Sequence, residues 1–297
     1  MNDTLSVIAA EMRGQVATVL ANWLKGVVHA DFDQMADTHL SVKHVEEKVQ
    51  VIDKYLPGFL TPGKKILEVG SGFGAFTVFT RILYGYDTIG VEPDSVVRSI
   101  ALQLAESCGT DCEIANCPGE ALIFPDETFD LVYSSNVLEH VQDPARVLSE
   151  SVRVLKPGGY LFFTYPNYCS FWEGHYGIFW IPCMNKSMAK MYVRLFGRFA
   201  GYIDGLQLMN VKFTKRILNP LLDKVDVIGL GDDLWVERMR TLKFGAWGQS
   251  SKLKSVLSFI QKIPLLVDLG IFVGKCMDWY YPIIVILRKK QNASSAD

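Results

Sequence analysis

The feature that most constrains this chain is an apolar run that ends in three glycines spaced two apart, ILEVGSGFG over residues 66–74. Gly70, Gly72 and Gly74 allow the backbone to turn tightly, and they allow a ligand to approach without meeting a Cβ atom. The segment therefore predicts a strand, a loop and the start of a helix. Loops of this kind occur in several classes of nucleotide-binding protein, so the neighbouring residues decide which ligand it binds.

Two carboxylates flank this loop. Glu68 lies two residues before Gly70, where it suits a cationic group such as an ammonium and would repel the pyrophosphate of a dinucleotide. The GxGxxG spacing of NAD-binding loops is also absent. Glu92 lies about twenty residues beyond the loop, after the next predicted strand, where a carboxylate can accept both hydroxyls of an adenosine ribose. The alternative role, capping a helix, suits Asp94 or Ser95 better.

Short apolar runs alternate with helical stretches from residue 65 onward, which predicts βαβ units around a parallel sheet. We expect an α/β, Rossmann-like sheet of seven strands, at 65–69, 87–91, 111–115, 130–134, 159–164, 225–229 and 283–287. Helices are expected at 74–84, 95–107, 144–155 and 213–222. An apolar stripe at helical spacing predicts a packing helix near the N-terminus, with members Leu5, Ile8, Met12, Val16, Val19, Trp23 and Val27, and a second helix is expected over 41–55.

These elements divide the chain into segments with different expected roles. We expect an N-terminal helical segment at 1–60, a cofactor-binding core at 61–165, a substrate cap at 166–211, the rest of the core at 212–290 with a helical insertion at 230–280, and a disordered tail at 291–297. The cap is too short and too aromatic to fold as a separate domain.

Five motifs follow one another in the chain: the glycine loop with Glu68, VEPD at 91–94, GEALIFPDETFDLV at 119–132, NVLEH at 136–140 and VLKPGGY at 154–160. In this order and spacing the chain resembles the class I S-adenosylmethionine-dependent methyltransferases. Within that family it is most similar to the small-molecule, type 11 group that includes ubiquinone-biosynthesis O-methyltransferases. The resemblance covers residues 64–164 without a break, with a weaker match at 212–230.

The resemblance implies an enzyme that uses S-adenosyl-L-methionine. It implies cofactor contacts by Glu68, Gly70, Ser71, Gly72, Gly74, Glu92, Pro93, Gly119, Glu120, Ala121 and Asn136. Glu120 and its neighbours would lie against the adenine, and Asn136 would border the methionine part. Pro118 stands where the family often has an acidic residue, so the adenine amino group would be contacted by backbone instead.

Aromatic residues crowd the segment after the fifth predicted strand, YPNYCSFWEGHYGIFW over 165–180. Ligands bind beyond the carboxyl ends of strands in open α/β sheets, so the acceptor is expected here. His175 is the candidate general base for a hydroxyl acceptor, and Glu173 is the residue that orients it. The alternative for His175 is an interior histidine satisfied by its neighbours. His140 either touches the substrate or, with Glu139, anchors the next helix, as the family implies.

Composition narrows the partners only in part. Residues 1–165 hold 12 Lys and Arg against 22 Asp and Glu, whereas residues 166–297 hold 18 against 10. A basic, aromatic half suits an anionic substrate or a membrane surface, and solvated helix faces explain it as well. The six cysteines lack the spacing of zinc ligands, and no cluster of carboxylates and histidines is visible, so no metal is expected.

The N-terminus lacks a basic region followed by an apolar core, so we expect a cytoplasmic protein in a reducing setting. Residues 263–273 are strongly apolar but too short for a membrane span. With the nearby lysines, residues 251–280 could lie at a membrane surface, pack inside, or form a homodimer contact.

The leading interpretation is methyl transfer to a small-molecule, glycan or lipid-linked acceptor, with oxygen favoured over nitrogen or carbon. An RNA methyltransferase and a non-catalytic cofactor-binding scaffold are the alternatives. The basic half supports the first alternative, although no RNA-binding module appears and no nucleic-acid partner is expected. The intact Glu68, glycines and Glu92 argue against the second.

Overall fold

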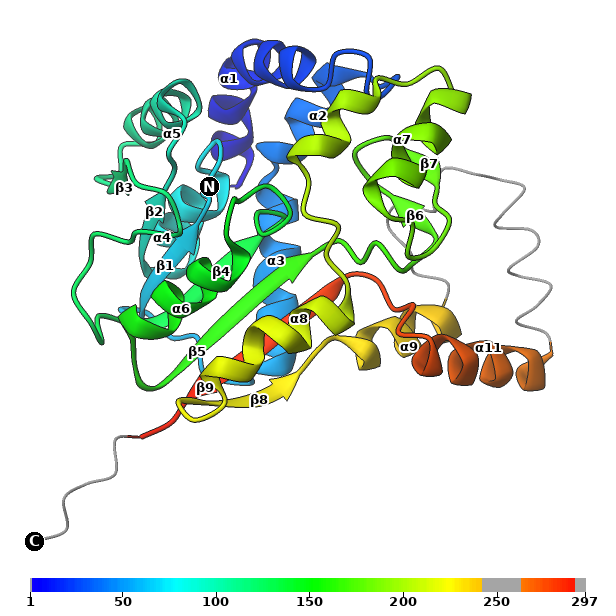
Figure 1. Ribbon diagram of the computed structural model, residues 1–297. Helices are drawn as coiled ribbons and strands as arrows, with labels where there is room; N and C mark the ends of the chain where they lie inside the picture. The colour runs from blue at the N-terminus through cyan, green and yellow to red at the C-terminus, as the bar shows by residue number, and fades with distance from the viewer. Residues whose placement is uncertain (1, 242–262, 292–297) are drawn as a thin grey trace, which may run out of the picture.

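The computed structural model describes residues 2–241 and 263–291. Its centre is a seven-stranded sheet with the order β3-β2-β1-β4-β5-β9-β8, as Figure 1 shows. The strands are β1 (Lys65–Val69), β2 (Asp87–Val91), β3 (Ile114–Ala115), β4 (Phe129–Ser135), β5 (Leu155–Tyr165), β8 (Val225–Gly229) and β9 (Ile283–Lys289). The strands β1 to β5 pair in parallel, whereas β9 runs antiparallel to both β5 and β8. The expected α/β, Rossmann-like sheet is confirmed.

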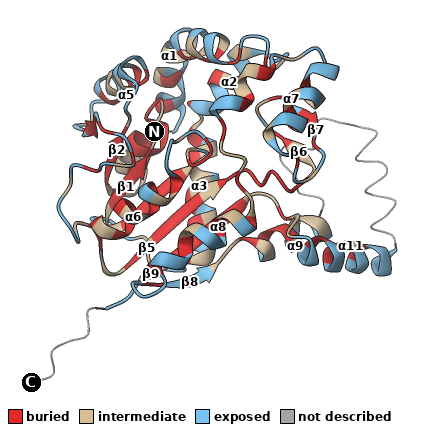
Figure 2. Ribbon diagram, viewed as in Figure 1, coloured by how far each residue is buried: buried red, intermediate tan, exposed pale blue. Residues whose placement is uncertain are grey.

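Helices cover both faces of this sheet. One face packs against α1 (Asn2–Trp23), α3 (Val42–Tyr55), α4 (Ala75–Tyr84) and α5 (Ser95–Ser107), and the other against α6 (Pro144–Val154) and α8 (Val211–Leu218). Alternate residues of β1 enter the two cores, since Ile66 joins one cluster and Leu67 the other. Figure 2 shows the consequence, a buried central sheet between helices whose outer faces are exposed.

The glycine loop connects β1 to α4 at the carboxyl end of the strand. Gly70, Gly72 and Gly74 all have positive φ, at 72°, 53° and 83°. A Cβ atom on Gly74 would lie 2.8 Å from the Cβ of Ala101 in α5, so this glycine is needed for close packing of two helices. The loop is thus packed against α5 at Gly74, whereas Gly72 has open space around it.

Residues 166–211 leave the sheet after β5 and return to it at α8. They contain a hairpin of β6 (Trp172–Glu173) and β7 (Ile178–Phe179), then α7 (Lys186–Leu195) and the 3-10 helix η1 (Ala200–Gly205). We call this segment the cap. Two of its large side chains, Tyr176 and Trp180, are fully buried and belong to the same core cluster as residues of β4 and β5, whereas others, such as Phe199, are exposed. A disulfide joins Cys169 to Cys183 within the cap. The spacing of the cysteines in the sequence did not indicate this bond.

The elements differ from the sequence expectations at several places. The third strand has only two residues, and the predicted helix at 213–222 is α8 followed by the 3-10 helix η2 (Asn219–Leu221). The helix α2 (Phe32–His39), the hairpin and α7 were not predicted. Within 230–280 the structure describes α9 (Asp232–Thr241) and α11 (Pro264–Cys276), while Lys252, Lys254, Lys262 and the tail from 292 lie outside the described residues.

The apolar stripe expected near the N-terminus is confirmed except at Trp23: Leu5, Val16 and Val27 are buried, and Ile8, Met12 and Val19 are partly buried against the core. The buried positions of α1 are Leu5, Ala9, Val16 and Leu20, whereas Trp23 is 47% exposed. The Trp23 ring stacks instead on Phe73 of the glycine loop, with the ring centroids 6.0 Å apart. An aromatic residue that the sequence assigned to the core therefore covers the loop.

Candidate functional site

The glycine loop presents an open backbone position at Gly72. A Cβ atom there would meet no atom within 4 Å, in contrast to Gly70, where it would lie 2.4 Å from the side chain of Val137. The two residues before Gly72 are held by hydrogen bonds to β2. The N–H groups of Gly70 and Ser71 both donate to the carbonyl of Val91, at 3.0 and 2.9 Å. The buried Ser71 hydroxyl has no hydrogen-bond partner among the described residues. The loop therefore combines an open backbone position at Gly72 with a backbone held by hydrogen bonds on its other side.

Glu92 extends from the end of β2 to this same loop. Its Oε2 accepts the N–H of Gly72 at 3.0 Å, and its Oε1 accepts the N–H of Asp94 at 3.0 Å. Asp94, not Glu92, caps α5, because its carboxylate accepts the N–H groups of Val96 and Val97. Each Glu92 oxygen keeps a lone pair for a further donor. The carboxylate is thus fixed at the open glycine and remains able to accept hydroxyls, and Pro93 beside it is exposed.

Glu68 lies deeper than the sequence indicated. It is 5% exposed and accepts a hydrogen bond from the Thr77 hydroxyl at 2.5 Å. Burial raises its pKa to about 7, although the charge of Lys48 in α3 and the bond from Thr77 act in the opposite direction. The carboxylate therefore lies beneath the loop, next to a cation of the protein itself. Its role toward a ligand ammonium stays a prediction.

The residues predicted to contact adenine form a turn beside α6. The carboxylate of Glu120 accepts the N–H groups of Gln142 and Asp143 at 3.0 and 3.3 Å, so it is turned toward the start of that helix. The N–H of Ala121 donates to the carbonyl of Pro118 at 3.1 Å, so the predicted contact of this turn with adenine stays a prediction. Asn136 is exposed at the end of β4 with a φ of 57°, a left-handed conformation that asparagine adopts more readily than most residues.

The two predicted acceptor-site histidines come together, although they are far apart in sequence. His140 follows β4 and His175 lies in the turn of the β6–β7 hairpin, and their Nε2 atoms are 3.1 Å apart. The rings are nearly perpendicular, with an interplanar angle of 87°. On its other side His175 Nδ1 lies 2.7 Å from Glu173 Oε1. The predicted orientation of His175 by Glu173 thus has the necessary contact.

Glu173 itself is held firmly in the cap. It is 1% exposed, and its Oε2 accepts the N–H of Tyr176 at 2.6 Å. Burial lowers the pKa of His175, but the hydrogen bond and charge of Glu173 outweigh this effect, so the net shift is upward. Burial lowers the pKa of His140 to about 3, and the neighbouring His175 adds to that effect. One histidine of the pair is therefore the stronger base.

Two further residues of this cluster were not identified as site residues from the sequence. Glu139 is fully buried, neither carboxylate oxygen has a hydrogen-bond partner among the described residues, and burial raises its pKa to about 7. The Tyr202 ring of η1 lies 5.5 Å from the His175 ring. Glu139 was visible in the NVLEH motif but was interpreted as an anchor, and no motif marks Tyr202.

The loop from 136 to 140 connects the two halves of the site. Val137 contacts Gly70 of the glycine loop, so the loop borders the open position at Gly72. Three residues later His140 faces the cap, and the carbonyl of Glu139 accepts the N–H of Gln207 at 2.7 Å. The cap also contacts the N-terminal segment, through the N–H of Phe199 and the carbonyl of Gly26 at 2.7 Å. The glycine loop follows β1 and the loop 136–140 follows β4, so both lie at the carboxyl end of the parallel strands (Figure 1).

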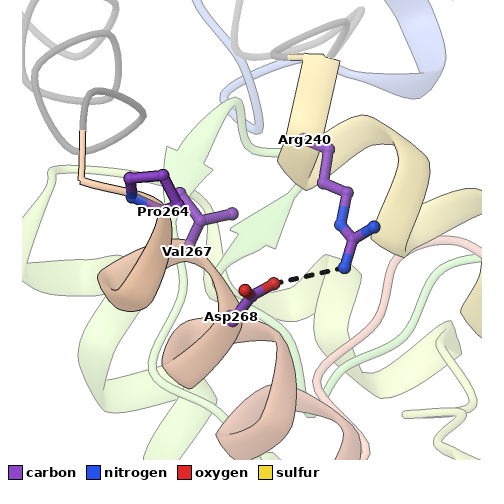
Figure 3. Close-up of a pocket in the computed structure, with 4 residues that line it drawn as sticks. All are labelled: Arg240, Pro264, Val267 and Asp268. Atoms are coloured by element: carbon purple, nitrogen blue, oxygen red, sulfur yellow. Dashed lines mark hydrogen bonds and ion pairs between the residues drawn. The ribbon is translucent and has the colours of Figure 1, made fainter.

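A separate hollow on the surface does not belong to this site. It lies between α9 and α11 and is lined by Arg240, Pro264, Val267 and Asp268, as Figure 3 shows. Arg240 and Asp268 form an ion pair across it at 3.2 Å, and both side chains are mostly exposed. None of the predicted site residues lines it.

Comparison with known proteins agrees with this geometry. Residues 67–163 match the family described as a methyltransferase domain. Over 112 residues the chain is 32% identical to phosphoethanolamine N-methyltransferase 3 of Arabidopsis thaliana, a match that covers 37% of this chain and 22% of that protein. It is 39% identical over 119 residues to an uncharacterized methyltransferase of Mycobacterium sp. (strain KMS), covering 39% of this chain and 43% of that protein. The chain thus spans well under two thirds of these relatives.

Solved structures share the fold at low identity. The phosphoethanolamine N-methyltransferase 2 of Haemonchus contortus, in complex with S-adenosyl-L-methionine, has a TM-score of 0.53 at 18% identity, covering 83% of this chain and 53% of that one. The [4+2]-cyclase SpnF has the same TM-score at 16% identity, covering 93% and 94%. Since one fold here carries two reactions, the fold alone does not identify the chemistry.

Proposed function

We propose that this chain, which contains a class I S-adenosylmethionine-dependent methyltransferase domain, transfers the methyl group of that cofactor to a hydroxyl of a small-molecule or lipid-linked acceptor held at the His140–His175 pair. The observation that carries the proposal is the loop 136–140, which touches the glycine loop through Val137 and the cap through His140. A single short segment thereby brings the two halves of a transfer site together.

The residues at the glycine loop fit the cofactor. The open space at Gly72 leaves room for it, the unpartnered Ser71 hydroxyl offers a hydrogen bond, and Glu92 is fixed where it can accept ribose hydroxyls. Gly70, Gly74, Pro93, Gly119, Ala121 and Asn136 would complete the binding surface. When bound, S-adenosylmethionine supplies a methyl group already activated on a sulfonium, so the protein mainly has to align the acceptor with it.

His175 is the proposed proton acceptor. Its Nδ1 lies 2.7 Å from the buried carboxylate of Glu173, which favours the tautomer with the proton on Nδ1. Nε2 is then unprotonated and can take the proton of a hydroxyl as the methyl group arrives. Glu173 acts as a positioning residue, since it holds the ring and stabilises the imidazolium that forms. In this tautomer the lone pair of Nε2 accepts from His140 Nε2 at 3.1 Å, so the hydroxyl takes the place of His140 at Nε2 and His140 borders it.

Nitrogen is the second candidate acceptor atom. The names of several relatives describe N-methyltransferases, and an amine is nucleophilic without a base once it has lost its proton. The contact of the half-buried His175 with the buried Glu173 supports oxygen, because a hydroxyl needs a base during the transfer itself. To separate the two, the loss of rate in His175 variants is measured with an alcohol acceptor and with the matching amine, and the two losses are compared.

The His175→Gln variant tests this proposal. It should lower kcat by about a hundredfold, the scale of general-base catalysis, while the affinity for the cofactor stays at the wild-type value. His29→Gln is the matched control, because His29 is exposed and outside the cluster. Wild-type kcat in His175→Gln would contradict the assignment of the base. Loss of cofactor affinity in that variant would instead indicate that the cap supports the cofactor site.

A peripheral membrane contact stays a prediction. No described helix has the length and apolar composition needed to cross a bilayer. In α11 several apolar side chains are exposed, with Leu265 at 77% and Phe272 at 65%. A lipid-linked acceptor would be reached from such a surface. Co-sedimentation with vesicles of anionic lipid checks this, and a protein that stays in the supernatant at low salt would contradict it. A homodimer through the same helix would appear as a doubled mass in solution.

A further inference from the structure

We propose that Glu139, His140 and His175 form a binding site for one divalent transition-metal ion of the zinc class. One ligand atom from each of these residues lies within 4.8 Å of the other two. The inference concerns the same cluster as the proposed function but does not depend on methyl transfer. The sequence predicted no metal, since two of the ligands lie in the NVLEH motif and the third in a different segment, 35 residues further on.

The distance between the two imidazoles fits two ligands of one ion. Zinc lies about 2.0–2.1 Å from a histidine nitrogen, so two nitrogens on it are about 3.3 Å apart in a tetrahedral site and about 2.9 Å apart at right angles. The observed separation of the Nε2 atoms is 3.1 Å. A hydrogen bond between the rings would have a similar length, so the histidines alone do not decide between the two.

Glu139 favours the ion. Its carboxylate is fully buried, and both oxygens lack a hydrogen-bond partner among the described residues. A buried polar group without a partner is costly, and no tautomer of the histidine pair provides one for both oxygens. Glu139 Oε1 already lies 3.8 Å from His140 Nε2. A shift of roughly 0.5 Å would bring it to the ligand spacing of a tetrahedral site.

Glu173 orients one of the proposed ligands without being a ligand itself. A histidine that binds a metal usually donates its other N–H to a carboxylate, which fixes the ring and leaves the ligating nitrogen free. Glu173 Oε1 is in this position, 2.7 Å from His175 Nδ1. The carboxylate is in turn held by the N–H of Tyr176. His175 is thus oriented with Nε2 toward His140 before any ion arrives.

The donor set selects the class of ion. Two imidazole nitrogens and one carboxylate suit zinc, cobalt, iron or manganese, whereas calcium and magnesium prefer oxygen ligands alone. Three protein ligands leave a position open for a further oxygen. The His140 side chain is 40% exposed, so an ion can enter from solvent. With the ion present, His175 Nε2 is a ligand and not a base, and a bound hydroxyl would lose its proton more readily through the metal.

Cobalt binding tests the site directly. The full chain is stripped with a chelator and titrated with Co²⁺, whose visible absorption reports nitrogen and oxygen ligands, and Zn²⁺ is then added. We expect one equivalent to bind, Zn²⁺ to displace it, and bound Zn²⁺ to raise the Tm. The variants Glu139→Gln and His140→Gln should each weaken Co²⁺ binding at least tenfold, whereas His29→Gln should match the wild type.

Two results would overturn the site: a wild-type chain that shows no visible absorption with excess Co²⁺, or unchanged Co²⁺ affinity in both ligand variants. The first needs no variant, so a misfolded mutant cannot obscure the outcome. Measuring methyl transfer on the same samples keeps the proposals separate. Transfer without Co²⁺ binding rejects the metal site and retains the proposed function. Co²⁺ binding by a chain that transfers no methyl group in either its metal-free or its metal-loaded form does the reverse.

Discussion

Glu92 is the residue that most clearly connects the end of a strand to the glycine loop. Its carboxylate spans from β2 to the N–H of Gly72. Glu92→Ala should weaken S-adenosylmethionine binding by about 1.5–3 kcal/mol, the value of hydrogen bonds to a charged group. Asp94→Ala is the control, because it removes the cap of α5 and costs about 1 kcal/mol of stability without touching the ligand. Calorimetry measures both, and equal affinities in the two variants would reject the ribose assignment.

The proposed contact of Glu68 with the cofactor's ammonium predicts a pH dependence of cofactor binding with a definite sign. Burial raises its pKa to about 7, so the carboxyl is largely neutral at pH 6 and ionised at pH 7.5. Only the ionised form attracts the ammonium of the cofactor, and affinity should therefore rise with pH, by up to about tenfold per unit below pH 7. Glu68→Gln, which can still accept from Thr77, should bind more weakly at pH 7.5 and show little dependence. A Gln variant with the wild-type slope would contradict this role.

At the scale of elements, alanine substitutions at three glycines test whether the cofactor binds at the glycine loop. Gly72 and Gly109 both have positive φ and open space around a Cβ atom, but only Gly72 lies in the loop. Alanine at either position should cost about 1–2 kcal/mol of stability through backbone strain, and Gly72→Ala alone should lose cofactor affinity, by tenfold or more. Gly74→Ala should lower the Tm further, because its Cβ would meet Ala101. If Gly72→Ala binds like Gly109→Ala, the ligand does not approach this glycine.

The elements that the sequence predicted well are those with a local signal. β1 and β2 match their predicted bounds because an apolar run is followed directly by glycines or by a cap. The strand β3 shrank to Ile114–Ala115, since the polar residues before it give no reason to pair. The β6–β7 hairpin was missed because each strand has only two residues and is held by burial of Tyr176 and Trp180, which is a tertiary effect.

For the whole molecule, the sequence alone does not predict which residues of distant segments lie next to one another in the fold. His140 and His175 were both singled out, yet nothing in their spacing indicates that their rings meet. Glu139 became part of the site only once its burial without a partner was known. The cap could be assigned to the acceptor from its place after β5, whereas its anchoring could not: the Asn167 side chain donates to the carbonyls of Asp278 and Tyr280, more than a hundred residues later.

The central claim is that this chain moves a methyl group from S-adenosylmethionine to an acceptor in the cap. The most direct measurement is incubation of the protein with methyl-labelled cofactor and a fractionated extract of small molecules and lipids, followed by identification of the labelled product. We predict one labelled product class, with equimolar S-adenosylhomocysteine, that Gly72→Ala and His175→Gln greatly reduce and His29→Gln leaves unchanged. Tight cofactor binding with no label transferred to a molecule of any fraction would contradict this claim and favour a non-catalytic role.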